Sequence, residues 1–166
     1  LRGEQEQIYQ ALENAVGNRI TLQYPRSGDH LSAVMISDLD GDGQDEAAVF
    51  YRKESSLSTE NALRLNLLDQ ADGTWMSVCD LPAEGAEVDR GFTADIGGRQ
   101  RLIIGYSQVD QSDKALVVYN YEGGTLAKSF TVSYSSFDVA DLDGDDQSEL
   151  LILKAAEGEH AAEAAV

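Results

Sequence analysis

Two stretches of this chain repeat each other without a gap, and this repeat constrains the fold more than any other sequence feature. SDLDGDGQDEAAVF begins at Ser37 and ADLDGDDQSELLIL begins at Ala140, so each residue of the second copy follows its counterpart by 103 positions. Each copy opens with alternating acids and ends in an apolar run typical of a β-strand. Residues 93–104, TADIGGRQRLII, have the same entry and the same apolar end but lack the acids. We interpret them as a degenerate third copy.

The spacing of the copies predicts how the chain is built. Asp38, Asp95 and Asp141 occupy the same position in the three copies and lie 57 and 46 residues apart. These distances bracket the period of a four-stranded β-propeller blade. Asp72-Gly73 and Glu122-Gly123-Gly124, each between strand-like segments, predict hairpins. Each unit therefore reads as a strand, an acidic turn, a strand, a linker and a hairpin.

Only the beginning of the chain has a helical pattern. Residues 4–16 place Ile8, Leu12 and Ala15 on one face, and Gly17 follows at the position of a C-terminal cap. We therefore predict an all-β fold of antiparallel β-propeller-like blades, about two and a half of them in an open or partial propeller, with one N-terminal α-helix. Residues 155–166 lack a strand pattern and are expected to form a short helix or a frayed end. The predicted units are 1–28, the helix and a lead-in strand; 29–86, blade 1 with an acidic loop; 87–135, the degenerate blade 2; and 136–166, a partial blade 3 with an acidic loop and an Ala/Glu tail.

The acids of the two complete copies are spaced as ligands of a hard cation. In each loop they occupy positions 1, 3, 5 and 9, and the residue at position 7 offers its backbone carbonyl. Ca²⁺ takes six to eight such oxygens, whereas Mg²⁺ demands a near-ideal octahedron and keeps its waters. Gly41 and Gly144 allow the backbone to fold tightly around an ion. We therefore expect two calcium sites, with the ligands Asp38, Asp40, Asp42, Gln44 and Glu46 in the first and Asp141, Asp143, Asp145, Gln147 and Glu149 in the second.

Two other interpretations, an EF-hand and a solvated turn, fit the two acidic loops less well. An EF-hand loop ends with a bidentate Glu at position 12 and runs between helices, but position 12 is Val49 in one loop and Ile152 in the other. Both lie in strand-like runs, so the EF-hand is rejected. A merely solvated turn explains most single Asp-Gly matches, yet here it would have to explain two gapless copies with five acids each.

The two complete copies resemble a known family. ISDLDGDGQDEAAVF and VADLDGDDQSELLIL are similar to FG-GAP repeats, also called VCBS repeats, the calcium-loop blades of integrin α-subunit propellers and of many bacterial surface proteins. The resemblance covers most of residues 29–154 and implies that the loops join two strands of one blade and bind Ca²⁺ through the residues given above. Asp146 departs from it, because Gly43 occupies that position in the first loop. The Asp95 loop has lost its acids and is expected to bind no ion.

Composition excludes several classes of partner and site. With 30 acidic and 12 basic residues the net charge is −18, which repels a phosphate backbone, so no nucleic-acid partner is expected. No apolar run reaches the roughly 18 residues of a membrane span, so no transmembrane segment is expected in this chain. The chain begins at Leu1, and any export signal or lipid anchor is expected upstream of it. Cys79 has no second cysteine to pair with and is interpreted as a packing residue.

The sequence shows no catalytic set. It contains no GxSxG, HExxH, P-loop or Cys–His arrangement, and His30 and His160 are interpreted as surface histidines. We therefore expect that the chain is not an enzyme. Aromatic residues in the strand-like segments are interpreted as packing residues, with an aromatic ligand platform as the alternative: Tyr51, Trp75, Tyr106, Tyr119 and Tyr121.

The expected function is a calcium-stabilised, non-catalytic binding or adhesion module with an unknown protein or glycan ligand. Extracellular calcium modules bind at about 10⁻⁴ to 10⁻³ M, so we expect a place outside the cell, on a bacterial surface as a lipid-anchored or secreted protein. Two alternatives remain open, namely an accessory part of a larger extracellular polysaccharide-active enzyme and a purely structural spacer. The incomplete third unit also predicts further blades or strand pairing at its open edge.

Overall fold

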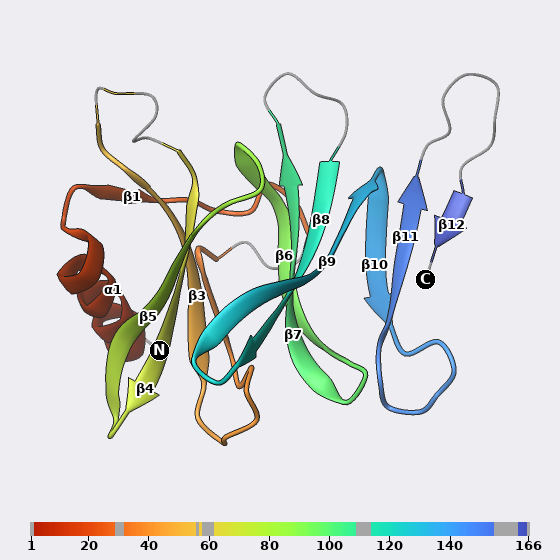
Figure 1. Ribbon diagram of the computed structural model, residues 1–166, viewed down its shortest axis with the longest axis horizontal. Helices are drawn as coiled ribbons and strands as arrows, with labels where there is room; N and C mark the ends of the chain where they lie inside the picture. The colour runs from red at the N-terminus through yellow and green to blue at the C-terminus, as the bar shows by residue number, and fades with distance from the viewer. Residues whose placement is uncertain are drawn as a thin grey trace.

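The chain forms an N-terminal helix followed by three antiparallel sheets that lie side by side (Figure 1). A computed structural model describes residues 2–28, 32–55, 57, 62–108, 114–154 and 163–165. Within these residues the predicted all-β fold with one N-terminal helix is confirmed, and no sheet closes into a barrel. No helix among the described residues is both long and apolar enough to cross a membrane.

The elements follow one another in a simple order. The helix is α1 (Arg2–Val16). Sheet A contains β1 (Ile20–Leu22), β2 (Val34–Ser37), β3 (Glu46–Lys53), β4 (Arg64–Ala71) and β5 (Thr74–Pro82). Sheet B contains β6 (Glu87–Ile96), β7 (Arg99–Ser107), β8 (Lys114–Glu122) and β9 (Thr125–Tyr134). Sheet C contains β10 (Ser136–Ala140), β11 (Glu149–Lys154) and β12 (Glu163–Ala165).

The sequence repeat coincides with a structural repeat. Its three copies join β2 to β3, β6 to β7 and β10 to β11, which is the same step in each sheet. The three connecting loops lie along one edge of the molecule, at the bottom of Figure 1. Both predicted hairpins are present, because Asp72 and Gly73 have φ values of 52° and 77° and Gly123 and Gly124 have φ values of 60° and 79°. Two residues in the left-handed region match the twist of the strands they connect.

The expectation for the tail is wrong where the structure describes it. Glu163–Ala165 forms β12, which pairs antiparallel with β11 in the register Lys154↔Glu163, Leu153↔Ala164 and Ile152↔Ala165. Strand pairing uses backbone groups, so a Glu-Ala-Ala segment can pair without any β-type side-chain pattern. Sheet C therefore has three strands, and residues 155–162 lie outside the described part of the chain.

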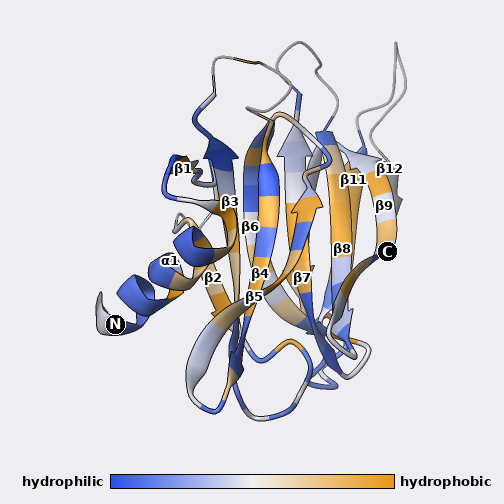
Figure 2. Cartoon of the chain, turned by 60° about the vertical axis from the view of Figure 1, so that its left-hand side comes forward, coloured by the Kyte–Doolittle hydropathy of each residue, from blue (hydrophilic) through white to orange (hydrophobic). Residues whose placement is uncertain are grey.

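Apolar side chains fill the spaces between the layers. Leu102 and Ile104 of β7 pack in the cluster shared with sheet A, together with Phe50 and Leu65. Ile103 lies on the other face of β7, in the cluster shared with sheet C. Because neighbouring residues of a strand point to opposite faces, the middle of sheet B is buried on both sides, whereas its edge strand β9 is largely exposed. Its central strands β7 and β8 are accordingly among the most hydrophobic in Figure 2.

The helix covers the outer face of sheet A. Ile8 and Leu12 are fully buried against a cluster that includes Leu68 and Trp75. Gly17 ends the helix as predicted, with φ of 95° and a hydrogen bond of 2.8 Å from its N–H to the Glu13 carbonyl. Ala15 was expected on the buried face but is exposed. Its methyl group is too small to fill the space beside β5, where a groove of about 360 Å³ remains.

The aromatic residues in the strands serve packing. Four of the tyrosines are at most 2% exposed, so they form no surface platform, and Trp75 is 6% exposed beneath α1. Their hydroxyls are paired inside the protein, as between Tyr106 and Tyr119 at 2.7 Å. Cys79 is half-buried and packs against the cluster between sheets A and B, in agreement with its predicted packing role. The buried tyrosines are Tyr51, Tyr106, Tyr119 and Tyr121.

Candidate metal centres

The loop between β2 and β3 gathers four carboxylates at one point. One ligand oxygen from each of them lies within 4.8 Å of all the others, and the four residues are Asp38, Asp40, Asp42 and Glu46. Asp38 follows the last residue of β2, and Glu46 is the first residue of β3. The two paired strands thus hold both ends of the loop, and the predicted acidic ligands come together. The carbonyl of Gln44 stays a predicted ligand.

Backbone amides of the loop orient these carboxylates. Asp38 Oδ1 accepts hydrogen bonds from the N–H groups of Gly41 and Asp42 at 2.9 and 3.1 Å, and its Oδ2 accepts one from Gly43 at 2.9 Å. Asp40 Oδ1 accepts from Asp42 N–H at 3.1 Å, and Asp42 Oδ1 accepts from Gln44 N–H at 2.8 Å. Asp40 and Asp42 therefore each keep a second oxygen that accepts no hydrogen bond from an amide of the loop. A tight turn with fixed carboxylates is what an oxygen-ligated cation requires.

Glu46 provides the strongest sign that an ion belongs in this loop. The residue is fully buried, and its Oε2 accepts hydrogen bonds from the N–H groups of Leu39 at 2.6 Å and Asp40 at 3.2 Å. Its Oε1 is buried and has no hydrogen-bond partner among the described residues. A buried polar atom without a partner costs free energy, so this oxygen fits the role of a metal ligand.

The same environment raises the pKa of Glu46 to about 8 in the ion-free protein. Burial is the main cause, because it disfavours the charged form, and the negative charges of Asp40 and Asp69 add to it. The pKa of Asp40 is also raised, by burial first and by the neighbouring charges of Asp42 and Asp69. The loop thus concentrates negative charge that a bound cation would offset.

Asp69 of β4 is a further acid beside this loop, and it was missed by the sequence argument. Its Oδ2 accepts a hydrogen bond of 2.8 Å from the Tyr121 hydroxyl of sheet B. The next residue, Gln70, donates its side-chain N–H to the Asp45 carbonyl of the loop at 2.9 Å. No spacing rule could have found Asp69, because only the pairing of β3 with β4 brings it to the loop.

The loop between β10 and β11 repeats all but one of the hydrogen bonds of the first loop, since the bond from Asp40 N–H to Glu46 has no counterpart at Asp143 among the described residues. Asp141 Oδ1 accepts from the N–H groups of Gly144 and Asp145 at 2.7 and 3.2 Å, and its Oδ2 accepts from Asp146 at 2.9 Å. Leu142 N–H donates to Glu149 Oε2 at 2.7 Å, as Leu39 N–H does to Glu46. The second cluster of oxygens within 4.8 Å comes from Asp141, Asp143, Asp145 and Glu149, while the carbonyl of Gln147 stays a predicted ligand.

The two loops differ in burial and in one backbone position. Asp141, Asp143 and Asp145 are exposed and Glu149 is half-buried, whereas Glu46 is fully buried. Asp146, at the position of Gly43, adopts φ of 68° in the left-handed region, where Gly43 has 89°. Aspartate tolerates this region better than most residues, so the departure from the repeat pattern changes no bond of the turn.

In the second loop the pKa values of Asp141 and Asp143 are shifted in opposite directions. Burial is the largest single influence on the pKa of Asp141 and raises it, but the hydrogen bonds from the amides of Asp146, Gly144 and Asp145 together outweigh burial and lower the pKa overall. The amide of Asp145 lowers the pKa of Asp143. The side chain of Asp145, burial and the charge of Glu149 outweigh that bond, so the pKa of Asp143 is raised. Like charges in one small loop again favour a bound cation.

The third copy forms a short hairpin instead of an acidic loop. Gly97 and Gly98, with φ values of 67° and 82°, turn the chain directly from β6 into β7. Asp95 lies on β6, and its carbonyl accepts a hydrogen bond of 2.8 Å from Ser148 N–H of the second acidic loop. The prediction that Asp95 binds no ion remains a prediction. His30 and His160 lie outside the described residues.

Comparisons with known proteins bear on the fold. No protein-family model matches the chain, and no curated protein matches it. Three solved structures are similar, each with 22% sequence identity: an exotype rhamnogalacturonan lyase, YesX, with a TM-score of 0.53; the rhamnogalacturonan lyase YesW, with 0.53; and a rhamnogalacturonan lyase of Bacillus licheniformis, PL11, with 0.50. The three matches cover 76%, 82% and 79% of this chain, respectively. They cover only 28%, 32% and 30% of the lyase chains, so this chain spans about a third of the length of those proteins. At this identity the likeness concerns the fold alone.

Proposed function

We propose that this chain is a calcium-stabilised binding module that holds one Ca²⁺ in each acidic loop. The observation that carries the proposal is the buried Oε1 of Glu46, which lies without a partner in a cluster of four carboxylates. The matching hydrogen bonds of the second loop support the second site. The FG-GAP resemblance of both loops points to the same ion.

Calcium fits the loops better than other common ions. All candidate side-chain ligands are carboxylates, and hard cations prefer oxygen. Ca²⁺ accepts irregular geometries with six to eight oxygens, while Mg²⁺ demands a near-ideal octahedron. Affinities of about 10⁻⁴ to 10⁻³ M are typical of extracellular calcium modules. We therefore propose a location outside the cell, at a bacterial surface, for this chain.

In this proposal the ions have a structural role and the chain is non-catalytic. Each ion would join the end of one strand to the start of the next, from Asp38 to Glu46 in sheet A and from Asp141 to Glu149 in sheet C. It would also offset part of the net charge of −18. The exposed loops and sheet edges, which the apolar clusters between the layers do not occupy, then remain available for a protein or glycan ligand.

Equilibrium dialysis with Ca²⁺ tests the proposal. The native chain is expected to bind two equivalents, and Asp40→Ala and Asp143→Ala are each expected to lose one. Asp95→Ala, the matched control in the degenerate copy, is expected to keep both. Binding of no calcium at millimolar concentration, or loss of calcium in Asp95→Ala, would overturn the assignment.

A second candidate function is an accessory part of a larger extracellular polysaccharide-active enzyme. The similarity of the fold to three rhamnogalacturonan lyases, of whose chains the match covers 28–32%, favours it. The chain alone is then expected to leave rhamnogalacturonan intact, whereas a longer product of the same gene is expected to shorten it. If neither acts on the polymer and no ligand is found on glycan or protein arrays, the structural-spacer alternative is supported instead.

A further inference from the structure

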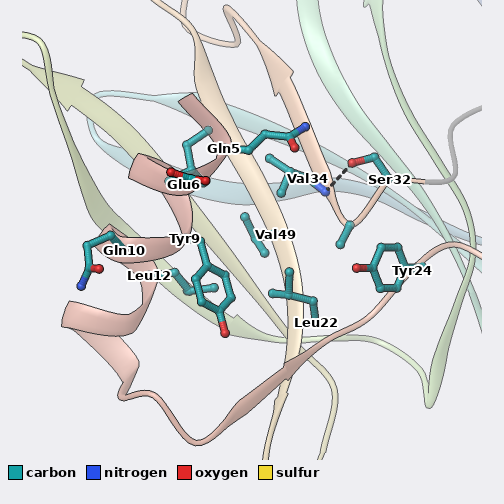
Figure 3. A pocket seen from close by; sticks show the side chains of 12 residues that line it. Gln5, Glu6, Tyr9, Gln10, Leu12, Leu22, Tyr24, Ser32, Val34 and Val49 are labelled. Atoms are coloured by element: carbon teal, nitrogen blue, oxygen red, sulfur yellow. Dashed lines mark hydrogen bonds between the residues drawn. The ribbon is translucent and has the colours of Figure 1, made fainter. Parts of the chain in front are cut away.

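A pocket of about 580 Å³ lies between α1 and the first two strands of sheet A, away from both acidic loops (Figure 3). This volume falls within the roughly 300–1,000 Å³ typical of small-molecule sites. Its residues come from α1, from β2 and β3, and from the segment that follows Arg19. No acidic-loop residue contributes to it, so the pocket is independent of the calcium proposal.

The floor of the pocket is apolar. Ile8 and Leu12 of the helix are fully buried there, and Val49 of β3 is 1% exposed. Leu22 and Val34 complete the floor, and Figure 3 shows Leu22, Val34 and Val49 between the helix and Tyr24. An occupant must therefore present an apolar surface to the floor, because an unpaired polar group buried there would be costly.

The rim carries neutral polar groups. In Figure 3 the Tyr24 hydroxyl points towards the helix, and the Gln5 amide lies across the opening from it. Neither side chain forms a hydrogen bond with another described residue, and the Tyr24 residue is 59% exposed. By contrast, the Ser32 hydroxyl is engaged as acceptor for the Val34 N–H at 3.1 Å. The amide and the phenol thus remain available to a ligand.

The backbone at Tyr24 is held in place, although the ring is exposed. The next residue, Pro25, is buried and restricts the backbone of Tyr24 to extended conformations. Gln23 N–H also donates to the Phe50 carbonyl at 2.9 Å, which fixes the segment against β3. With the backbone fixed, only the side-chain torsions of Tyr24 remain to be ordered on binding, so its exposed ring suits a stacking role.

The charges around the pocket exclude an anion. Glu6 is the one ionisable acid among the described lining residues, and none of them is Lys or Arg. The net charge of −18 adds a general repulsion of anions. A neutral ligand with hydroxyl groups matches the amide and phenol of the rim, and its apolar face matches the floor.

We propose that this pocket binds a neutral saccharide unit, and that it favours a ring bearing a methyl group, such as a 6-deoxyhexose. The ring stacks on Tyr24, its hydroxyls bond to Gln5 and to the Tyr24 hydroxyl, and its methyl group packs against Leu22 and Val34, the half-buried part of the floor. This inference deepens the binding role proposed above and names its ligand class, but it does not depend on bound calcium.

Saturation-transfer difference NMR on the full chain tests the proposal, with methyl α-L-rhamnopyranoside, methyl α-D-glucopyranoside and the methyl glycoside of galacturonic acid as probes. The deoxyhexose is expected to bind most tightly, the hexose more weakly and the uronate not measurably. Tyr24→Ala and Gln5→Ala are each expected to weaken rhamnoside binding by about tenfold or more. The matched controls are Gln7→Ala, on an exposed position of the same helix outside this pocket, and Phe130→Ala, an exposed ring on sheet B.

Several results would overturn the inference. Equal binding of the uronate and the rhamnoside would show that charge does not select the ligand. Unchanged binding in Tyr24→Ala would place the sugar elsewhere, and a concentration-dependent dimer that Tyr24→Ala abolishes would assign the pocket to a second copy of the chain. Calcium dialysis on the same variants separates the two proposals, because Tyr24→Ala is expected to retain both ions whatever happens to the sugar.

Discussion

At the scale of single residues, Glu46 has the environment that departs most from what a carboxylate prefers. It is fully buried, one of its oxygens has no partner among the described residues, and its neighbours include two further acids. The adjacent backbone amides of Leu39 and Asp40 satisfy only the other oxygen. The loop could therefore hold a cation, and without one Glu46 keeps its proton to an unusually high pH.

This protonation predicts how the calcium-free protein responds to pH. The pKa of Glu46 rises from the ordinary 4.5 to about 8 on folding, so between these values the folded state holds a proton that the unfolded state has lost. The contribution of Glu46 to stability is complete below about pH 4.5 and is lost as the pH rises through 8. Urea unfolding in chelator at pH 5, 6, 7 and 8 is expected to show this decline. The part of this decline that comes from Glu46 is expected to disappear in Glu46→Gln. An identical pH profile of stability in the native chain and in the variant would contradict the prediction.

Asp146 predicts a stabilising substitution. Its φ of 68° is costly for a residue with a side chain, while Gly43 occupies the same place in the first loop without that cost. Asp146→Gly is expected to raise the free energy of unfolding by up to about 1 kcal/mol, as measured by urea unfolding in calcium. The uncharged change Gly43→Asn should lower it by a similar amount, since the Cβ meets no atom and the backbone conformation is the main difference. A destabilised Asp146→Gly would show that the Asp146 carboxylate has another role.

At the scale of elements, sheet B depends on close contact with its neighbours on both faces. Gly105 of β7 lies where an added Cβ would come within 2.1 Å of the Tyr134 hydroxyl and 2.9 Å of the Phe137 ring. The Tyr134 hydroxyl cannot move freely, because it donates to Asp89 Oδ2 at 2.7 Å and Lys114 pairs with the same oxygen at 3.2 Å. The missing side chain at Gly105 thus permits the contact of β7 with β9 and β10.

Gly105→Ala is therefore expected to destabilise the protein by about 1–3 kcal/mol, the usual cost of overpacking. The measurement is the free energy of unfolding in urea. Gly3→Ala is the matched control, because a Cβ at Gly3 meets nothing within 4 Å and the position lies in a helix. That control should be neutral or slightly stabilising, and equal effects at the two positions would contradict the packing argument.

At the scale of the whole molecule, α1 and sheets A, B and C stack in chain order, with apolar clusters between successive layers. The two acidic loops lie on the same edge, one in the first sheet and one in the last. Tyr121 of sheet B reaches Asp69 beside the first loop, so this loop is joined to the neighbouring sheet as well as to its own. An ion in it would stabilise contacts beyond the loop.

Calcium is therefore expected to raise the melting temperature. A site that forms only in the folded state contributes about 2.7 kcal/mol when free Ca²⁺ is 100 times the dissociation constant, which corresponds to roughly 5–10 °C for a chain of this size. Two independent sites should add, so Asp40→Ala and Asp143→Ala should each retain part of the shift in scanning calorimetry. A melting temperature that is the same in chelator and in millimolar calcium would contradict the proposal.

The sequence alone determined the features that depend on local order along the chain. The gapless repeat predicted equivalent loops between paired strands, the glycine and aspartate pairs predicted the hairpins, and the spacing of the acids predicted which carboxylates converge. These are short-range properties, because side-chain direction in a turn or strand follows from backbone conformation. Even there Ala15 was misplaced, since helical periodicity gives a direction but not the distance to the sheet.

Tertiary structure decided what depends on residues far apart in the chain. Asp69 joins the first loop only because β4 pairs with β3, and Glu163–Ala165 becomes a strand only because the edge of β11 accepts its backbone. The pocket beside Tyr24 exists only because α1 packs across sheet A at that point. Hydrophobic periodicity marks the buried face of an element, but it does not show which elements pack together or how deeply a single carboxylate is buried. Only the folded chain therefore shows the unpaired oxygen of Glu46 and the available amide and hydroxyl of the pocket.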